Sequence, residues 1–328
     1  MMAASREHAA PAAALGTRRR AAAAPLPPRS ALGAVLGSDR AFMLLATVPC
    51  AIWLLVMTLG PALFNLVASL TPMNLTRPGS GWDFSQPFAN YLLMREDDLF
   101  LNSLWVQARL SFWSVLLQMA MGLGIALILN IQTPLYQRLR TVFLVPMVLP
   151  PIVVAVIWKV LYDPSTSPLY WFMGLFGLDD VASMTTSADW ALTAIIIGET
   201  WEWFPFTMLM ILAGLSTLPE EQYEAARIDG ASALQITWEV VLPHISNVLI
   251  VAAIFRMIDS FKAFPLIFVL TSGGPGHVTD TTNFYSYRQA FEYSFIGYSS
   301  AITVVLLSIT TVLSIIALKL VKWRRTDG

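Results

Sequence analysis

The sequence predicts an all-α integral membrane protein, for two reasons. Of its 328 residues, 56% are hydrophobic and 12% are charged, whereas a soluble domain carries about 25% charged residues. Several apolar runs are also long enough to cross roughly 30 Å of hydrocarbon. The net charge of −1 indicates no nucleic-acid partner. The single cysteine, Cys50, excludes an intrachain disulfide and a cysteine metal cluster.

Hydropathy divides the chain into a tail and one membrane domain. Residues 1–38 are rich in Ala, Pro and Arg and have no periodic apolar face, so we expect a disordered cytoplasmic tail rather than a cleaved signal peptide. Residues 39–328 then form the membrane domain. We expect six spans, near residues 41–70, 104–130, 141–162, 190–215, 248–270 and 296–321. Pro49 and Pro61 are expected to kink the first of them.

Basic residues predict the orientation, because Lys and Arg concentrate in cytoplasmic loops. One side of the predicted topology carries Arg6, Arg18, Arg19, Arg20, Arg29, Arg40, Arg138, Arg140, Arg227, Lys319, Lys322, Arg324 and Arg325. The other side carries Arg77, Arg95 and Arg288, with Arg109 and Lys159 near span ends. Both termini and the loop between the fourth and fifth spans are therefore predicted to be cytoplasmic.

That loop, about residues 217–247, has the pattern of two short helices. Pro219 and the acidic residues after it suit the first turn of a helix, where a missing N–H is harmless and the dipole favours negative charge. Gly230 suits the helix end, because it adopts a left-handed conformation without steric cost. Ser232 and Gln235 have capping-box spacing for a second helix, which Pro243 is expected to limit or kink. A helix, a glycine hinge and a second helix between two spans indicate a docking element.

The residues of this loop resemble a known motif. The pattern is E-A-A, three residues, G, nine residues, an aliphatic residue, any residue, and L-P, over residues 224–243. It resembles the cytoplasmic loop of permease subunits of binding-protein-dependent ABC importers, with Val240 where Ile is usual. The resemblance covers about residues 41–321. Thr271-Ser272-Gly273-Gly274-Pro275 is similar to the T-x-G-G-P signature of the sugar-type permeases in that family.

The resemblance implies a type I ABC importer permease fold with cytoplasmic coupling helices, in a bacterial cytoplasmic membrane. It implies four partner subunits besides membrane lipid: a second homologous permease, two cytoplasmic ATPases and an extracytoplasmic solute-binding protein. ATP and Mg would bind to the ATPases, since this chain has no G-x-x-x-x-G-K-[S/T] and is not expected to be an enzyme. The expected docking residues are Glu224, Ala225, Ala226, Asp229, Gly230, Leu242 and Pro243. Glu224 is expected to make a charged contact, and Gly230 to be the hinge.

Charged residues inside two predicted spans form a second candidate site. Ionisable groups at membrane depth are costly unless they are paired or face water, so they indicate function by default. Glu199, Glu202, Trp203 and Phe206 share one helical face, and Arg256, Asp259, Ser260 and Ala263 repeat the spacing on the next span. Carboxylates, a guanidinium and aromatic faces suit a polyhydroxylated solute. Two alternatives remain open: a structural ion pair of Arg256 with Glu199 or Glu202, and a proton relay.

The resemblance supports this second site. Residues 201–206 (WEWFPF) look like a W-x-x-aromatic-P-aromatic run of the maltose-type permease, and an ungapped count places its sugar-contacting positions on these same eight residues. The residues at those positions in the relative are mostly neutral, so the sequence leaves a sugar, a disaccharide, a polyol and a phosphorylated polyol open. No metal site is predicted, because His8, His244 and His277 have no second ligand at metal spacing.

Two other function classes predict features that differ from those of an importer subunit. A secondary transporter driven by an ion gradient predicts an inverted repeat with broken helices, and no sustained repeat is visible. A membrane enzyme predicts catalytic acids or His gathered at one interface, whereas the charges lie on helical stripes within spans. The sequence therefore favours the permease subunit of an importer.

Overall fold

The computed structural model of the protein describes residues 39–131, 133–176 and 183–326, so the predicted tail over residues 1–38 lies outside the described residues. Every regular element among the described residues is a helix, in agreement with the predicted fold class. In chain order they are α2 (Asp39–Ser69), η1 (Ser80–Trp82), α3 (Ala89–Glu96), α4 (Asp98–Leu129), α5 (Pro134–Phe143), α6 (Val145–Val148), α7 (Pro151–Leu161), α8 (Pro168–Gly174), α9 (Ala191–Leu215), α10 (Glu220–Ile228), α11 (Ala233–Ile236), η2 (Thr237–Val241), α12 (Leu242–Ser260), α13 (Pro265–Leu270), α14 (Thr282–Tyr287), η3 (Arg288–Glu292) and α15 (Ile296–Thr326).

The chain separates into two units, residues 1–60 and 61–328. The described part of the first unit is the N-terminal part of α2, in which every side chain from 42 to 60 is exposed. These residues are apolar enough to cross a membrane. Helix α2 continues through both Pro49 and Pro61, so neither proline ends it.

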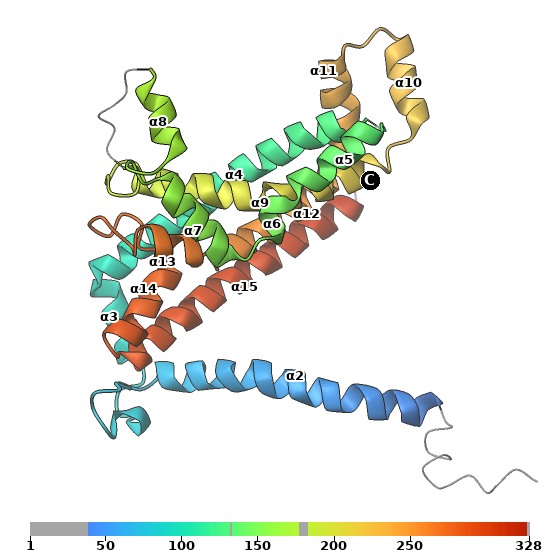
Figure 1. The fold of residues 1–328 in the computed structure, drawn as a ribbon. Helices are drawn as coiled ribbons and strands as arrows, with labels where there is room; N and C mark the ends of the chain where they lie inside the picture. Colours follow the sequence, from blue (N-terminus) through green and yellow to red (C-terminus); the bar gives the residue numbers. More distant parts are fainter. Residues whose placement is uncertain (1–38, 132, 177–182, 327–328) are drawn as a thin grey trace, which may run out of the picture. The chain divides into compact units, whose positions relative to one another are not determined.

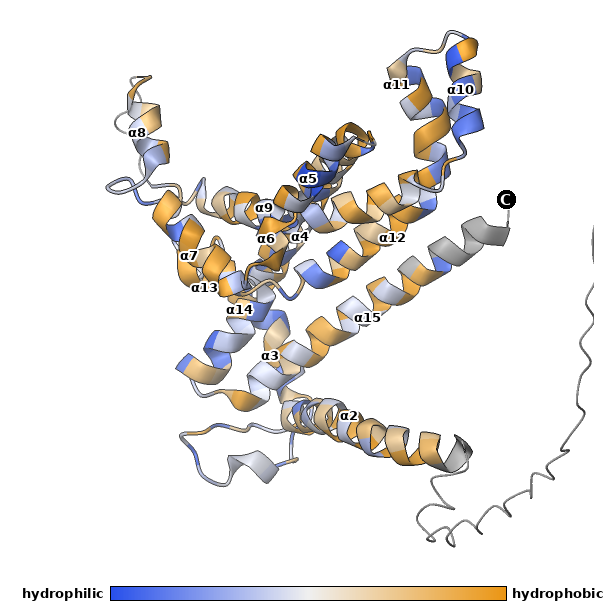
Figure 2. Ribbon diagram, turned by 45° about the vertical axis from the view of Figure 1, so that its right-hand side comes forward, coloured by the Kyte–Doolittle hydropathy of each residue, from blue (hydrophilic) through white to orange (hydrophobic). Residues whose placement is uncertain are grey.

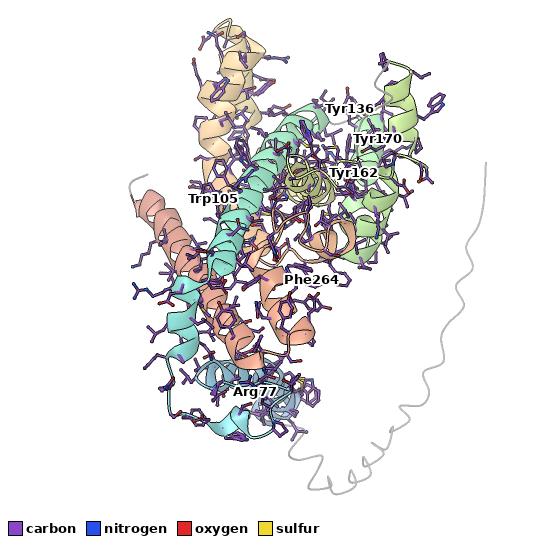
Figure 3. All side chains as sticks on the ribbon, turned by 90° about the vertical axis from the view of Figure 1, so that its left-hand side faces the viewer. Arg77, Trp105, Tyr136, Tyr162, Tyr170 and Phe264 are labelled. Atoms are coloured by element: carbon purple, nitrogen blue, oxygen red, sulfur yellow. The ribbon has the colours of Figure 1, made fainter. Side chains whose placement is uncertain are left out.

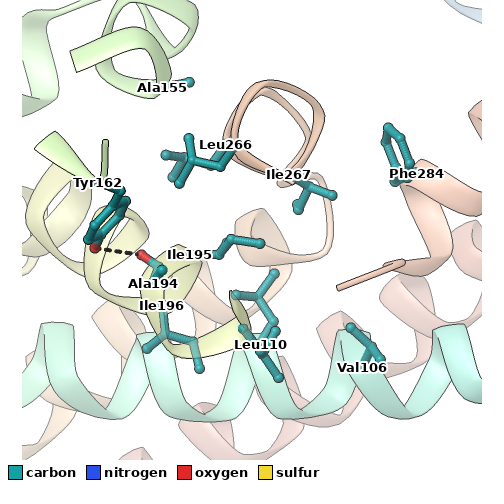
Figure 4. Close-up of a cluster of buried hydrophobic side chains, with 12 residues drawn as sticks. Val106, Leu110, Ala155, Tyr162, Ala194, Ile195, Ile196, Leu266, Ile267 and Phe284 are labelled. Atoms are coloured by element: carbon teal, nitrogen blue, oxygen red, sulfur yellow. Dashed lines mark hydrogen bonds between the residues drawn. The ribbon is translucent and has the colours of Figure 1, made fainter. Parts of the chain in front are cut away.

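The second unit is built on two long helices that lie side by side, α4 and α9 (Figure 1). Helix α12 packs against both. Buried apolar side chains from α4, α7, α9, α13 and α14 form one core, and Tyr162 adds a hydrogen bond from its hydroxyl to the carbonyl of Ala194 within it (Figure 4). A second core lies between α4, α9, α11 and α12 and includes Ile236 of α11. The first core joins α4 to α9, and the second joins both of them to α12.

Five helices in the described part of the chain are long and apolar enough to span a membrane: α2, α4, α9, the continuous stretch Ala233–Ser260, and residues Ile296–Ile316 of α15. The predicted third span, 141–162, is divided among α5, α6 and α7. Prolines 146, 150 and 151 explain the division, because proline lacks the N–H that a helix interior requires. Helix α7 has 11 residues, about 16 Å. The count of six crossings stays a prediction.

The predicted fifth span, 248–270, was wrong in its continuity. Helix α12 ends at Ser260, and a short break over residues 261–264 precedes α13. Pro265 stands in the first turn of α13, where its fixed φ is favourable. Phe264, labelled in Figure 3, lies at this break and packs against the first core. The break directly follows the turn that carries Arg256 and Asp259, and it contains Lys262.

Asp97 joins the start of α4 to two other helices. Its carboxylate accepts hydrogen bonds from the backbone N–H groups of Leu99 and Phe100 and from the hydroxyls of Tyr285 and Tyr298. Burial acts to raise the pKa of Asp97, but these four hydrogen bonds outweigh it and hold the pKa below its usual value. The ends of α4, α14 and α15 are thereby linked.

Gly122 allows α4 and α9 to approach closely, which generates a first prediction. A Cβ at this position would overlap the hydroxyl of Thr207 and lie 2.9 Å from the backbone nitrogen of Met208. We expect Gly122→Val to lower the thermal unfolding temperature of the purified protein, because overpacking costs about 1–3 kcal/mol. Gly124→Val is the matched control, since nothing lies within 4 Å of a Cβ there. Equal unfolding temperatures for the two variants would contradict this close approach.

Candidate functional site

The predicted docking element exists as two helices at one end of the second unit (Figure 1). Helix α10 ends in a Schellman motif: Gly230 has φ +78°, its N–H donates to the carbonyl of Arg227, and the N–H of Ala231 donates to the carbonyl of Ala226. Nothing lies within 4 Å of a Cβ at Gly230. Glycine is therefore favoured there by the positive φ and not by a lack of space. The predicted glycine helix end is confirmed.

The second helix of the element begins as predicted and ends differently. Ser232 and Gln235 form a complete capping box at the start of α11. The helix then widens into a π turn over Thr237–Val241 and continues as α12. The prediction that Pro243 would limit this helix was wrong, because Pro243 sits in the first turn of α12 after the π turn. The docking element is therefore continuous with a membrane helix.

The predicted docking residues face two directions. Glu224, Ala225, Asp229, Gly230 and Pro243 are exposed, whereas Ala226 and Leu242 pack against the second core. Helix α10 has no fully buried residue and is mostly hydrophilic, unlike α7 (Figure 2). Glu224 lines a hollow of about 1080 Å³ together with Arg140 and Arg227. The motif thus supplies both an anchor to the protein and a charged exposed surface.

The charged stripes of α9 and α12 meet at Arg256. Its guanidinium donates to Glu199 at 3.2 Å, to Asp259 at 2.7 Å and to the Gln118 side-chain oxygen at 2.8 Å. It also lies 4.4 Å from the ring centroid of Trp203, a cation–π distance. Arg256 is 2% exposed. Of the two ion pairs considered from sequence, the structure contains the pair with Glu199.

A cavity of about 120 Å³ lies beside this ion-pair network. Its lining includes Glu199, Glu202, Trp203, Asp259, Lys262 and Ala263, from both stripes. Glu202 is 2% exposed and makes no hydrogen bond or ion pair with any residue that the structure describes. Its carboxyl group is therefore an unpaired polar group of the cavity among the described residues, as is the Lys262 ammonium.

Three predicted residues do not line this cavity: Arg256, Ser260 and Phe206. Arg256 lies behind the lining, where its guanidinium is engaged by Gln118, Glu199 and Asp259. Ser260 is buried toward α4: its hydroxyl donates to the carbonyl of Met257, and its own carbonyl accepts from Gln107. Phe206 is partly buried and lies outside the cavity lining. Ser260 is therefore part of the helix contact.

Sequence reasoning missed a polar stripe on α4. The buried members are Ser103, Gln107, Ser111, Ser114 and Gln118. Gln118 is central, since its side chain donates to the carbonyl of Glu199 and its own carbonyl accepts from the Thr207 hydroxyl. The signal was present in the sequence, because spacings of three and four place these residues on one helical face.

Comparison with known proteins decides the family. Residues 118–326 match the family described as binding-protein-dependent transport system inner membrane component. The chain belongs to this family. It is 35% identical to a probable ABC transporter permease of Sinorhizobium fredii, over 78% of this chain and 82% of that protein. It is 36% identical to the trehalose/maltose transport system permease protein of Thermococcus litoralis, over 72% of this chain and 79% of that protein.

A solved structure shares the fold. It is that of a bacterial ABC transporter involved in the import of the acidic polysaccharide alginate, with a TM-score of 0.74 and 21% identity over 87% of this chain and 96% of that one. The permease is thus the membrane component of a transport system that depends on a binding protein and on ATP. Nucleotide binding and hydrolysis belong to separate subunits, and this chain is not an enzyme.

The Arg256 network generates a second prediction. Arg256→Met leaves the buried Glu199 without its partner, and breaking a buried pair in this way costs about 3–5 kcal/mol. We expect a lower unfolding temperature for the purified permease. Asp259→Asn is the control, because Asp259 lies on the same helix as Arg256, so no pair between helices is broken, and an amide oxygen can still accept from the guanidinium. An Arg256→Met protein as stable as Asp259→Asn would show that the pair does not hold the helices together.

Proposed function

We propose that this permease imports a sugar or a related polyhydroxylated solute, and that the cavity beside Arg256 contacts it. The unpaired Glu202 carboxyl carries this proposal, because it accepts hydrogen bonds from hydroxyl groups. Trp203 supplies an aromatic face in the same cavity. Arg256 has its donors engaged by three neighbours, so its role is to position Glu199 and Asp259. The relative from Thermococcus litoralis, named for trehalose and maltose transport, supports the sugar class.

The assembly that we propose contains five subunits. This permease pairs with a second, homologous permease, and two cytoplasmic ATPases bind ATP and Mg below them. An extracytoplasmic solute-binding protein delivers the solute. We place the complex in a bacterial cytoplasmic membrane with both termini of the chain in the cytoplasm, on the distribution of Lys and Arg. ATPase closure alternates the access of the cavity to the two sides.

Coupling to the ATPases is assigned to the exposed part of the docking element. Glu224 makes the charged contact, and Gly230 sets the angle between α10 and α11. Ala226 and Leu242 hold the element to the second core. Because residues Ala233–Ser260 form one continuous helix, a displacement of α11 reaches the Arg256 network directly.

Uptake measurements test the solute class. The complete transporter, reconstituted in proteoliposomes with its binding protein and internal ATP, is expected to accumulate radiolabelled trehalose or maltose. Glu202→Ala should reduce this uptake about tenfold, since one lost hydrogen bond to a buried group costs about 1–3 kcal/mol. Transport of neither these sugars nor a polyol such as sorbitol would refute the proposed class. Unchanged uptake by Glu202→Ala would remove the cavity from the solute path.

Two substitutions test the docking element. Glu224→Lys reverses a charge, and Gly230→Pro replaces φ +78° by about −65°. We expect both to abolish most uptake while the amount of permease in the membrane stays the same. Glu221→Lys is the matched control on α10, because Glu221 is exposed but does not line the hollow with Glu224. Gly230→Asn should retain more activity than Gly230→Pro, since Asn tolerates the left-handed region. Normal uptake by Glu224→Lys would exclude its docking role.

A further inference from the structure

The cavity beside Arg256 holds more negative than positive charge. Its lining contains three carboxyl groups and one amino group, on Glu199, Glu202, Asp259 and Lys262, and its other lining residues are uncharged. The Arg256 guanidinium lies behind the lining and pairs with two of the carboxylates. With every group ionised, three carboxylates face two cations, so the cavity lacks one positive charge.

The missing charge belongs beside Glu202. Arg256 lies 3.2 Å from the Glu199 carboxylate and 2.7 Å from that of Asp259. Glu202 lines the same cavity and is 2% exposed, without a hydrogen bond or an ion pair to any described residue. A buried carboxylate without a partner is costly, above all at membrane depth. A ligand that carries N–H donors and a positive charge would remove this cost.

Lys262 does not fill that place. It lies in the break after α12 and is exposed, whereas Glu202 is buried, and these two described side chains form no ion pair with each other. Water and salt screen an exposed charge far more than a buried one. The inner part of the cavity is therefore governed by the Glu202 carboxylate, with the Lys262 ammonium at its exposed side.

Trp203 adds a second feature that suits a cation. Its ring lines the cavity and already attracts the Arg256 guanidinium, whose carbon lies 4.4 Å from the ring centroid. The face of an indole ring attracts organic cations through its quadrupole. One carboxylate and one ring suit a primary ammonium group, which has three N–H donors. A quaternary ammonium group has no N–H and is bound by cages of several rings.

We propose that the cavity selects a sugar bearing a primary ammonium group, which binds the Glu202 carboxylate. The proposal rests on the sugar class of the proposed function and adds the charge of the solute to it. A charged donor forms a hydrogen bond about twice as strong as a neutral one, so an amino sugar binds more tightly than its hydroxyl counterpart. A sugar with a carboxylate or phosphate is disfavoured, because it adds negative charge to a cavity that already has a surplus.

Direct binding to the permease tests the charge, because the solute-binding protein would otherwise take part in the selection. The assembled transporter, in lipid nanodiscs and without its binding protein, is titrated with glucosamine, glucose and glucuronate. These three hexoses differ in charge, and the glucosamine amine is mostly protonated at about pH 6.5. Saturation-transfer NMR of the sugars detects weak binding. We expect glucosamine to bind about tenfold more tightly than glucose, and glucuronate to bind most weakly.

Substitutions at Glu202 assign the preference to its charge. Glu202→Gln keeps the shape and an acceptor oxygen but removes the charge, so the affinity ratio of glucosamine to glucose should fall to about one. Glu202→Asp keeps the charge and should retain a preference for glucosamine. Asp189→Asn is the matched control, since it removes an exposed carboxylate just before α9 that does not line the cavity. Thermal unfolding of each variant verifies that it is folded.

Three results would overturn the proposal. Tightest binding of glucuronate would assign the charge selection to Lys262. Absent binding of glucosamine, or equal binding of glucosamine and glucose, would show that the cavity does not select a cation. An unchanged preference in Glu202→Gln would show that Glu202 is neutral or is paired by another subunit.

Uptake by the complete transporter separates this proposal from the proposed function. If the transporter imports no sugar but the nanodisc complex prefers glucosamine through Glu202, the proposed function fails and the charge selection stands. If the transporter imports maltose or trehalose but the nanodisc complex shows no preference, the proposed function stands and the charge selection fails.

Discussion

The membrane part of this permease depends on one buried guanidinium. Arg256 of α12 bonds to Gln118 of α4 and Glu199 of α9, so a single side chain connects the three helices that pack together. A charge in this position is costly unless each donor finds a partner. Asp259 and the Trp203 ring provide two further partners for the guanidinium. Replacement of Arg256 therefore affects both the helix contact and the cavity beside it.

The same network explains which groups remain for a solute. Glu199 and Asp259 are engaged by Arg256, whereas Glu202, one turn along the same helix face as Glu199, has no partner among the described residues. The structural ion pair and the proposed solute site are thus compatible. The ion pair fixes the geometry, and the residue left out of it supplies the free carboxyl group. Breaks in the predicted spans contribute as well, because the interruption after Ser260 brings Lys262 and Ala263 to the cavity.

The docking element illustrates local control of structure. A Schellman motif at Gly230 and a capping box at Ser232 satisfy the backbone groups at two adjacent helix ends, so the turn between α10 and α11 is well defined without burial. Ala226 and Leu242 then fasten it to the second core. A turn that is rigid by itself and continuous with α12 suits a part that transmits force.

The sequence by itself determined the fold class, the turn between the two helices of the docking element and the two charged stripes. These features follow from local rules: hydrophobic length, capping chemistry and helical spacing act over a few residues. Tertiary structure alone decided which charges pair. From the sequence, Arg256 could pair with either Glu199 or Glu202 of α9. Only the packing of α9 against α12 selects Glu199. It also decided that Ser260 faces α4 and that Gln118 joins three helices, because a helical face does not reveal which neighbour it meets. Tertiary structure also decided where the predicted spans break. A proline in an apolar run permits either a kink or a helix end, and contacts with other helices select between them.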